Sequence, residues 1–188
     1  MRLLIASDIH GSIRYMEHLV KRIEEEKPSK ILLLGDLLYH GPRNDLPSGY
    51  DTKAVAVRLN SLKDDIICVR GNCDSDVDQM VLDFPIMADY AIVSEGDMNI
   101  YASHGHIHGE KSSLCHDGGI MLCGHTHVPK VAEYEDYTYI NPGSVSIPKE
   151  GSHHGYIMME NHRFVFKDVE TGLETGLIYE WKRKDRNI

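Results

Sequence analysis

The chain has 188 residues, a formal net charge of −9, 41% hydrophobic residues and 26% charged residues. This composition is typical of one globular domain, and we expect a single domain over residues 1–188. The acidic balance argues against a surface that coats nucleic acid, because phosphate backbones attract clustered Lys and Arg. Every apolar run is shorter than the roughly 20 residues of a membrane helix. Residues 3–6 are too few for a signal-peptide core, so we expect a cytoplasmic protein without a membrane partner.

The first half of the chain predicts alternating strands and helices. Short apolar runs at residues 3–6, 31–34 and 66–69 have the length of buried strands. Apolar residues at helical spacing between 13 and 23, after the candidate N-cap Ser12, predict a helix. A second helix is expected at about 51–62, and a third opens at the capping box from Ser75 to Asp78. Right-handed parallel crossovers should connect the three strands.

The second half predicts strands joined by loops. Apolar runs lie at residues 100–102, 120–123, 137–140, 156–159 and 164–166. We expect loops between these strands, so the α/β layers should pass into a mixed, more antiparallel sheet. The charged tail at about 182–188 is expected to fray.

Side chains that bind metals follow several of these predicted strands. They are Asp8 and His10, Asp36, Asn72, His104, and His125 with His127. Ligands bind outside the carboxyl ends of strands in such sheets, so these side chains can converge on one point. Carboxylate, imidazole and amide donors suit Mn²⁺, Fe, Zn²⁺ or similar ions. Two ions roughly 3.5–4 Å apart would clamp a phosphoryl group for in-line displacement, with a bridging hydroxide as the nucleophile.

Each motif by itself has a simpler interpretation. Gly35-Asp36 is ordinary turn chemistry, and Asp8 with His10 at one strand end is a weak signal. Two histidines at i and i+2 in a turn, such as His125 and His127, can chelate an ion. Their succession at consecutive strand ends is what favours a metal site.

The motifs D-x-H, G-D, G-N-[HC]-D, a later His and G-H-x-H occur in this order between residues 8 and 127. This series resembles the calcineurin-like metallophosphoesterase superfamily. Segments HGPRN at 40–44, RGNCD at 70–74, GHTH at 124–127 and NPGSVS at 141–146 bring the resemblance closer to the YfcE-type phosphodiesterase branch. The resemblance implies an α/β fold, a four-layer α/β/β/α sandwich of two mixed sheets.

The resemblance also implies a ligand set for two divalent ions, with Asp36 bridging them. The first ion would be held by Asp8, His10, Asp36 and His127, and the second by Asp36, Asn72, His104 and His125. Mn²⁺ is the ion we expect first, with Zn²⁺, Fe²⁺ or Ni²⁺ as alternatives.

Asp36, Asn72 and Cys73 are the candidate catalytic residues, and Arg43, Cys73 and His106 are the candidate substrate contacts. Cys73 stands where much of the superfamily has a His that assists the leaving group, and a thiol carries no positive charge. Cys73 could therefore affect the chemistry or only fill space. Arg43 suits a phosphoryl group but could equally anchor its loop, and His106 could equally brace its own loop.

These residues favour an enzyme that hydrolyses a small phosphodiester substrate. A different class is a binding scaffold, such as the phosphoesterase-fold subunit of retromer, but a scaffold has no need for the full ligand set. Protein phosphatases and dinucleoside tetraphosphatases are alternatives within the enzymes, although they carry His at the position of Cys73. The long segment 39–50 predicts a functional or interfacial loop, and with it a homo-oligomer.

Overall fold

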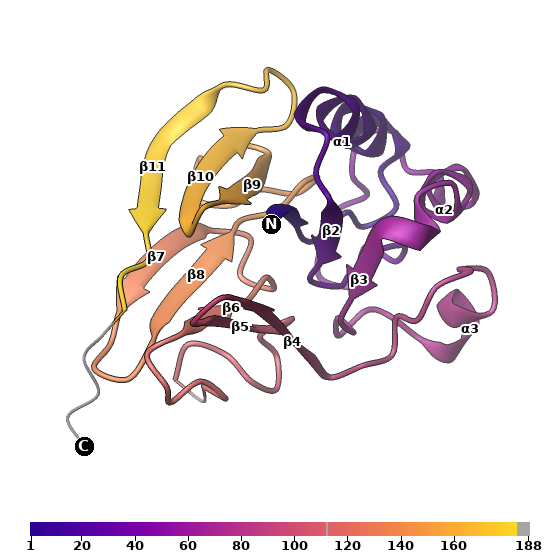
Figure 1. Ribbon diagram of the computed structural model, residues 1–188. Helices are drawn as coiled ribbons and strands as arrows, with labels where there is room; N and C mark the ends of the chain where they lie inside the picture. Colours follow the sequence, from indigo (N-terminus) through magenta and orange to yellow (C-terminus); the bar gives the residue numbers. More distant parts are fainter. Residues whose placement is uncertain (112, 184–188) are drawn as a thin grey trace.

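Two stacked β-sheets form the centre of the computed structural model, which describes all residues except 112 and 184–188 (Figure 1). Helices α1 (Ile13–Glu26) and α2 (Thr52–Asn60) cover the outer face of the first sheet. The short helices η1 (Lys63–Asp65) and α3 (Asp76–Gln79) follow on the same side of the molecule. Most of the predicted charged tail lies outside the described residues.

The first sheet has the strand order β11-β10-β9-β1-β2-β3. Strands β1 (Arg2–Ala6), β2 (Lys30–Leu33) and β3 (Ile66–Cys68) are parallel. Strand β9 (Gly155–Glu160) pairs antiparallel with β1, and β10 (Arg163–Asp168) and β11 (Glu174–Glu180) continue the sheet antiparallel. The first sheet is therefore mixed, as the sequence predicts.

The second sheet has the order β4-β5-β6-β8-β7. Its central strands β5 (Met98–Ser103), β6 (Ile120–Leu122) and β8 (Thr138–Pro142) are parallel. The edge strands β4 (Tyr90–Glu95) and β7 (Pro129–Glu133) are antiparallel to their neighbours. Two mixed sheets confirm the predicted fold, whereas β4, β7 and β11 are strands that the apolar runs do not predict.

Strand β1 shows how the layers are held together. Leu3 and Ile5 point into the core between the two sheets, while Leu4 and Ala6 point toward α1 and α2. Successive side chains of a strand face opposite ways, so a continuous apolar run is what a strand buried on both faces requires.

Helix α1 begins and ends as its sequence predicts. The Ser12 hydroxyl accepts a hydrogen bond from the Tyr15 amide, and Lys27 ends the helix in the left-handed region with φ of 49°. Met16 and Leu19 are buried against the first sheet. Helix α3 opens with the predicted capping box between Ser75 and Asp78.

The outer face of the second sheet is covered by coil. The segment 104–119 contains no helix in its described part, and its buried Cys115 packs against Met121, Cys123 and Tyr139. The outer layer on this side is therefore a loop, in contrast to the helices that cover the first sheet.

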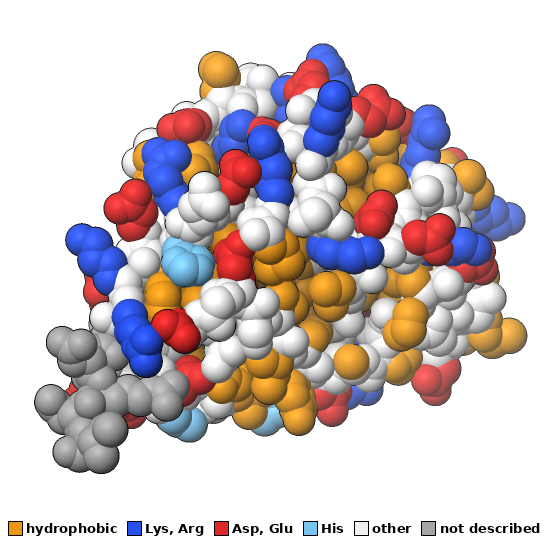
Figure 2. Space-filling view, viewed as in Figure 1, with side chains coloured by type: hydrophobic (Ala, Val, Ile, Leu, Met, Phe, Trp, Pro, Cys, Tyr) orange, Lys and Arg blue, Asp and Glu red, His pale blue; other side chains and the backbone are white. Residues whose placement is uncertain are grey.

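The molecular surface differs between the two sheets (Figure 2). Acidic and basic side chains are interspersed over α1 and the β9–β11 side. Hydrophobic side chains gather around edge strand β4, where Tyr90 and Ile92 are exposed. Among the described residues, the helices are too short or too polar to cross a membrane.

Candidate metal centre

The ends of five strands, β1, β2, β3, β5 and β6, carry the predicted ligands to one place where both sheets meet. Those whose side chains are buried are Asp8, His10, Asp36, His104 and His127. His125 is partly buried and Asn72 is exposed at the mouth of the site. Strands far apart in sequence therefore bring these polar groups together in the interior.

Asp8, His10 and His127 form the first group. Oδ1 of Asp8 lies 3.1 Å from Nε2 of His127 and 3.5 Å from Nε2 of His10. The two Nε2 atoms are 3.2 Å apart. These three side chains can place one ligand atom each on a common ion.

Asp36, His104 and Asn72 form the second group. Nε2 of His104 lies 3.4 Å from Oδ2 of Asp36 and 3.0 Å from Oδ1 of Asn72. The ring of His125 is 5.1 Å from that of His104, centroid to centroid. Oδ2 of Asp36 is also 3.7 Å from Nε2 of His10, so Asp36 lies between the two groups, as a bridging ligand must.

Three of the histidines are oriented in the same way. Nδ1 of His10 donates to the Tyr39 carbonyl, Nδ1 of His104 to the Leu34 carbonyl and Nδ1 of His127 to the Ile147 carbonyl, each at 2.7 Å. A carbonyl oxygen only accepts, so the proton of each neutral imidazole is on Nδ1. The lone pair on Nε2 then faces the centre, which is the arrangement that metal-binding histidines adopt.

Oδ1 of Asp8 is the polar atom that fits a cation most directly. It is buried and accepts no hydrogen bond among the described residues, while Oδ2 accepts from the Ser7 hydroxyl at 2.6 Å and from the His125 amide at 3.1 Å. A buried carboxylate oxygen beside neutral imidazoles is costly unless a metal ion lies there or an imidazole takes up a proton. The donor set therefore fits divalent metal ions.

The backbone at the ligands is strained. Five of them have positive φ angles between 48° and 68°, which non-glycine residues rarely adopt; these are Asp8, His10, Asp36, His125 and His127. Such conformations cluster at functional sites, where the surrounding structure maintains them. Neighbouring glycines make room: a Cβ on Gly71 would lie 2.1 Å from Oδ1 of Asp36.

Residues outside the ligand set hold these strained loops. Asp74 accepts hydrogen bonds from the backbone amides of Asp36, Leu37 and Gly71 at 2.7–2.9 Å. The Ser144 hydroxyl donates to the Asp8 carbonyl at 2.8 Å. The sequence motif at 141–146 marks a turn but gives no sign that it supports the loop of β1.

The carboxylates and imidazoles of the candidate metal centre shift one another's pKa values. Burial raises the pKa of Asp8, but the facing imidazoles of His10 and His127 outweigh burial and hold it well below its usual value. Burial lowers the pKa of His104, but the carboxylates of Asp36 and Asp8 outweigh burial and raise it to about 9. In the metal-free protein, protons on imidazoles therefore balance the buried carboxylates.

A cavity of about 400 Å³ opens onto the centre from solvent. The predicted residues Asp36, Asn72, Cys73 and Arg43 line it, together with His125 and His127. Lys149 also lines it, although an isolated lysine gives no signal in the sequence. Two cationic side chains thus lie beside the ligand cluster.

Two predicted substrate contacts have distinct surroundings. Burial and the neighbouring carboxylate of Asp36 raise the pKa of Cys73 to about 12, so its thiol is neutral near pH 7. The ring of His106 lies 5.4 Å from that of His104, but His106 is not part of the cavity lining. The geometry thus brings Cys73 and Arg43 to the cavity, whereas His106 lies beside His104 outside the cavity lining.

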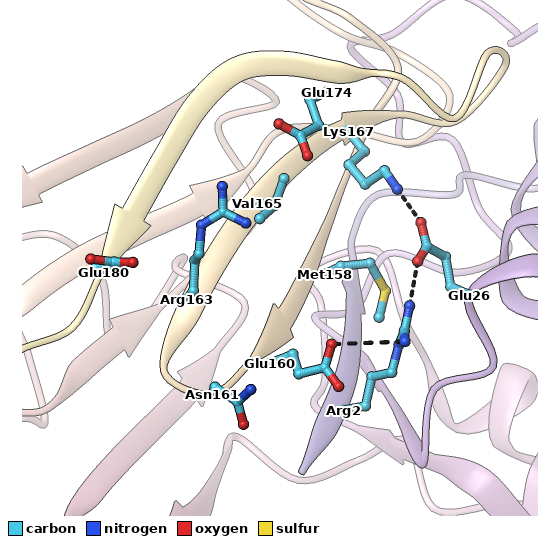
Figure 3. A pocket seen from close by; sticks show the side chains of 10 residues that line it. All are labelled: Arg2, Glu26, Met158, Glu160, Asn161, Arg163, Val165, Lys167, Glu174 and Glu180. Atoms are coloured by element: carbon cyan, nitrogen blue, oxygen red, sulfur yellow. Dashed lines mark hydrogen bonds and ion pairs between the residues drawn. The ribbon is translucent and has the colours of Figure 1, made fainter.

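A second charged cavity, of about 340 Å³, lies along β9, β10 and β11 and includes Arg2 at the start of β1 and Glu26 at the end of α1 (Figure 3). There Glu26 accepts from Arg2 at 2.8 Å and also pairs with Lys167. The partners of Glu26 are permanently charged side chains, and this cavity lacks the histidine cluster. The metal chemistry therefore belongs to the end where Asp8 and Asp36 lie.

Comparison with known proteins gives concordant results. Residues 1–163 match the family model of the calcineurin-like phosphoesterase superfamily domain. Phosphodiesterase YfcE of Escherichia coli is 43% identical over 162 residues, which cover 86% of this chain and 88% of that protein. The solved structure of Escherichia coli YfcE, described as a phosphoesterase, has a TM-score of 0.93 at 37% identity and covers 97% of this chain and 100% of that chain.

A more distant likeness concerns the fold alone. The structure of Vps29 from Entamoeba histolytica, complexed with zinc, has a TM-score of 0.61 at 16% identity. It covers 97% of this chain and 100% of that chain. Identity this low says nothing about whether the two proteins share an activity.

Proposed function

The chain belongs to the calcineurin-like phosphoesterase superfamily, and we propose that it hydrolyses small phosphodiesters with two divalent metal ions and a hydroxide that bridges them as the nucleophile. It is a phosphoric diester hydrolase, as its 43% identity to phosphodiesterase YfcE over most of both chains indicates. The observation that carries the dinuclear proposal is the pair of ligand groups that share Asp36.

Each ion would have four protein ligands in this proposal. Asp8, His10, Asp36 and His127 would hold the first, and Asp36, Asn72, His104 and His125 would hold the second. Buried Oδ1 of Asp8 and the lone pairs on Nε2 of the histidines support this assignment. When bound, the two ions supply a water of lowered pKa as the nucleophile and neutralise charge on the phosphoryl group.

The side chains of the cavity would position the substrate. Arg43 and Lys149 offer cationic donors for the phosphoryl oxygens on the side open to solvent. Cys73 is held beside the ligands, since its amide donates to Oδ1 of Asp36 at 2.8 Å. Its neutral thiol adds no positive charge near the ester oxygens, so we expect diesters with good leaving groups to react fastest.

Hydrolysis of bis-p-nitrophenyl phosphate tests the proposal. Protein stripped with EDTA should be inactive, since carboxylate, amide and imidazole donors with open positions need an added divalent ion. We expect Mn²⁺ to restore the most activity, with Zn²⁺, Fe²⁺ or Ni²⁺ as alternatives that the same donors can hold. Exposed His153, which is 63% accessible, provides the control His153→Ala with unchanged activity. Full activity of stripped protein in EDTA would contradict the proposal.

Three further expectations stay predictions: one functional domain over the whole chain, a cytoplasmic location and a homo-oligomer. The oligomer rests on the segment 39–50, where Tyr39 and Leu46 are 42% and 62% exposed. Sedimentation equilibrium at micromolar concentration should show more than the 21.3 kDa of one chain.

A further inference from the structure

Beside the metal centre lies a second, largely apolar pocket of about 510 Å³. We call it the tyrosine pocket; its apolar lining includes Tyr39, Tyr50, Ala56, Cys73, Val77 and Val81, and Thr52, Lys53, Ser75 and Asp78 also line it. They come from the loop after β2, from α2 and from the region of α3. This volume is in the range of pockets that bind small molecules.

The tyrosine pocket adjoins the cavity of the metal centre. Cys73 lines both. The carbonyl of Tyr39 accepts the Nδ1 proton of His10 at 2.7 Å, and the amide of Cys73 donates to Asp36 at 2.8 Å. Two hydrogen bonds to predicted ligands therefore fix the tyrosine pocket next to the reacting centre.

The two cavities differ in chemistry. The one at the metal centre is polar and carries Arg43 and Lys149. The two tyrosines of the tyrosine pocket pack edge-on against the ring of His40, at 4.8 Å from Tyr39 and 5.3 Å from Tyr50. His40 itself is not part of the lining, and Val77 and Val81 are 68% and 50% exposed. A wall of aromatic and aliphatic groups is suited to a flat apolar ring.

A phosphodiester carries two organic groups on a single charged phosphoryl group. We propose that the tyrosine pocket binds an aromatic ester group of the substrate, an aryl ring or a nucleobase, while the phosphoryl group lies at the metal centre. This inference rests on the proposed phosphodiesterase function and adds its substrate class: diesters with at least one aromatic substituent. Tyr39, Tyr50, Val77 and Val81 are then specificity-determining residues.

Two diesters with the same leaving group provide the test: bis-p-nitrophenyl phosphate and methyl p-nitrophenyl phosphate, both with Mn²⁺-loaded protein. The variant is Val77→Asn with Val81→Asn, which makes the pocket polar without adding charge. The matched control is Val57→Asn on α2, since Val57 is 69% exposed and lies outside the pocket lining. Comparing each variant with the wild type cancels the different intrinsic reactivities of the two diesters.

We expect the double variant to lose about tenfold in kcat/KM with bis-p-nitrophenyl phosphate, mainly through KM, because apolar contact area is lost. The control should keep the wild-type value. A similar loss with both diesters places the departing ring in the pocket, and a loss with the bis-aryl diester alone places the retained ring there; both support the proposal.

The inference about the tyrosine pocket would be overturned if the double variant kept the wild-type kcat/KM, or if Val57→Asn lost as much kcat/KM as the double variant. Neither result would affect the proposed hydrolysis of phosphodiesters. Sedimentation checks a competing occupant, a second copy of this chain: a wild-type oligomer that dissociates in the double variant with unchanged kcat/KM would also overturn it. If wild-type protein hydrolyses neither diester, the proposed function fails and the inference fails with it.

Discussion

The two ends of the first sheet both bury charge, but in different ways. At the amino end of β1, the carboxylate of Glu26 is paired with Arg2 and Lys167 (Figure 3). At the carboxyl end, Asp8 and Asp36 face imidazoles. Guanidinium and ammonium groups hold their protons near pH 7, whereas an imidazole can give its proton up in exchange for a metal ion. A buried carboxylate paired with Arg or Lys is therefore a structural ion pair, whereas one that faces imidazoles can be part of a metal-binding site.

The backbone does not follow the same division. At the carboxyl end the loops carry Asp8 and Asp36 at φ of 59° and 56°, but Lys27 and Asn161 near the amino end are also left-handed, at φ of 49° and 52°. Lys27 ends helix α1, and Asn161 lies in the turn between β9 and β10. The two ends therefore differ in the partners of their buried carboxylates and not in the sign of their φ angles.

Removing the shared ligand should have the largest effect. Asp36→Asn removes the one charged ligand that both proposed ions share and leaves the first ion only the carboxylate of Asp8, so we expect kcat/KM for bis-p-nitrophenyl phosphate to fall by about 10³-fold or more. Circular dichroism should show that the variant is folded. Near-normal turnover with two ions per chain would mean that Asp36 does not bridge.

Cys73→His should place a proton donor beside the departing oxygen. General acid catalysis contributes roughly 10²–10⁴-fold, so alkyl and nucleoside esters should gain by up to about 10²-fold while aryl esters change less. Cys73→Ser, which also lacks a cation, should keep the wild-type dependence of rate on leaving-group pKa. If the rates of Cys73→His and of wild type depend on leaving-group pKa with the same slope, residue 73 only fills space.

Metal binding should release protons at the carboxyl end. The pKa of His104 is raised to about 9 in the metal-free protein, so its imidazole is protonated below that pH and must lose the proton to bind a metal. Affinity for Mn²⁺ should therefore rise by up to about tenfold per pH unit as the pH approaches 9. Calorimetry in two buffers of different ionisation enthalpy should detect this release, and identical enthalpies would rule it out.

A change in the ion pairs of Glu26, near the amino end of β1, should alter the stability of the fold but not metal binding or activity. Burial raises the pKa of Glu26, but Lys167 and Arg2 outweigh burial and lower it from 4.5. Ionised Glu26 therefore stabilises the fold above about pH 4.5, and this contribution is lost as the pH falls through the lowered pKa. Glu26→Gln should reduce the free energy of unfolding by about 1–3 kcal/mol near pH 7 and have little effect at low pH.

Urea unfolding at both pH values measures this difference. Asp97→Asn is the matched control, because Asp97 and its partner Arg183 are 67% and 68% exposed and such surface pairs contribute little. Metal content and kcat/KM should be unchanged in Glu26→Gln. A loss of bound metal in that variant would contradict the claim that the ion pairs of Glu26 serve stability and not metal binding.

The sequence predicts the central strands because burial on both faces leaves a continuous apolar run, as in Leu3, Leu4 and Ile5. It does not predict the edge strands β4, β7 and β11. The side chains of β4 and β11 alternate between partly buried and exposed, and residues such as Ser94 and Glu174 interrupt the apolar pattern. The edge strand β3 is predicted because its residues Ile66, Ile67 and Cys68 do form an apolar run. A strand without such a run forms because a neighbour offers hydrogen bonds, and no local pattern encodes that neighbour.

The candidate site follows a similar rule. The convergence of the candidate ligands could be predicted because strand ends are visible in the sequence and meet at one edge of the sheet. The contribution of Lys149 and the support of Asp8 by Ser144 could not, because both depend on how the loop after β8 folds over the cavity. The tyrosine pocket likewise arises from packing between α2, α3 and the loop after β2.

The number of metal ions bound per chain tests the central claim most directly. Wild type, His127→Ala and His153→Ala would be loaded with Mn²⁺, desalted and measured by elemental analysis, with the melting temperature as a second readout. We predict two ions in wild type and in His153→Ala, one in His127→Ala, and a melting temperature that rises on loading. A wild-type chain that stays free of metal, or a His127→Ala chain that still binds two ions, would contradict the account.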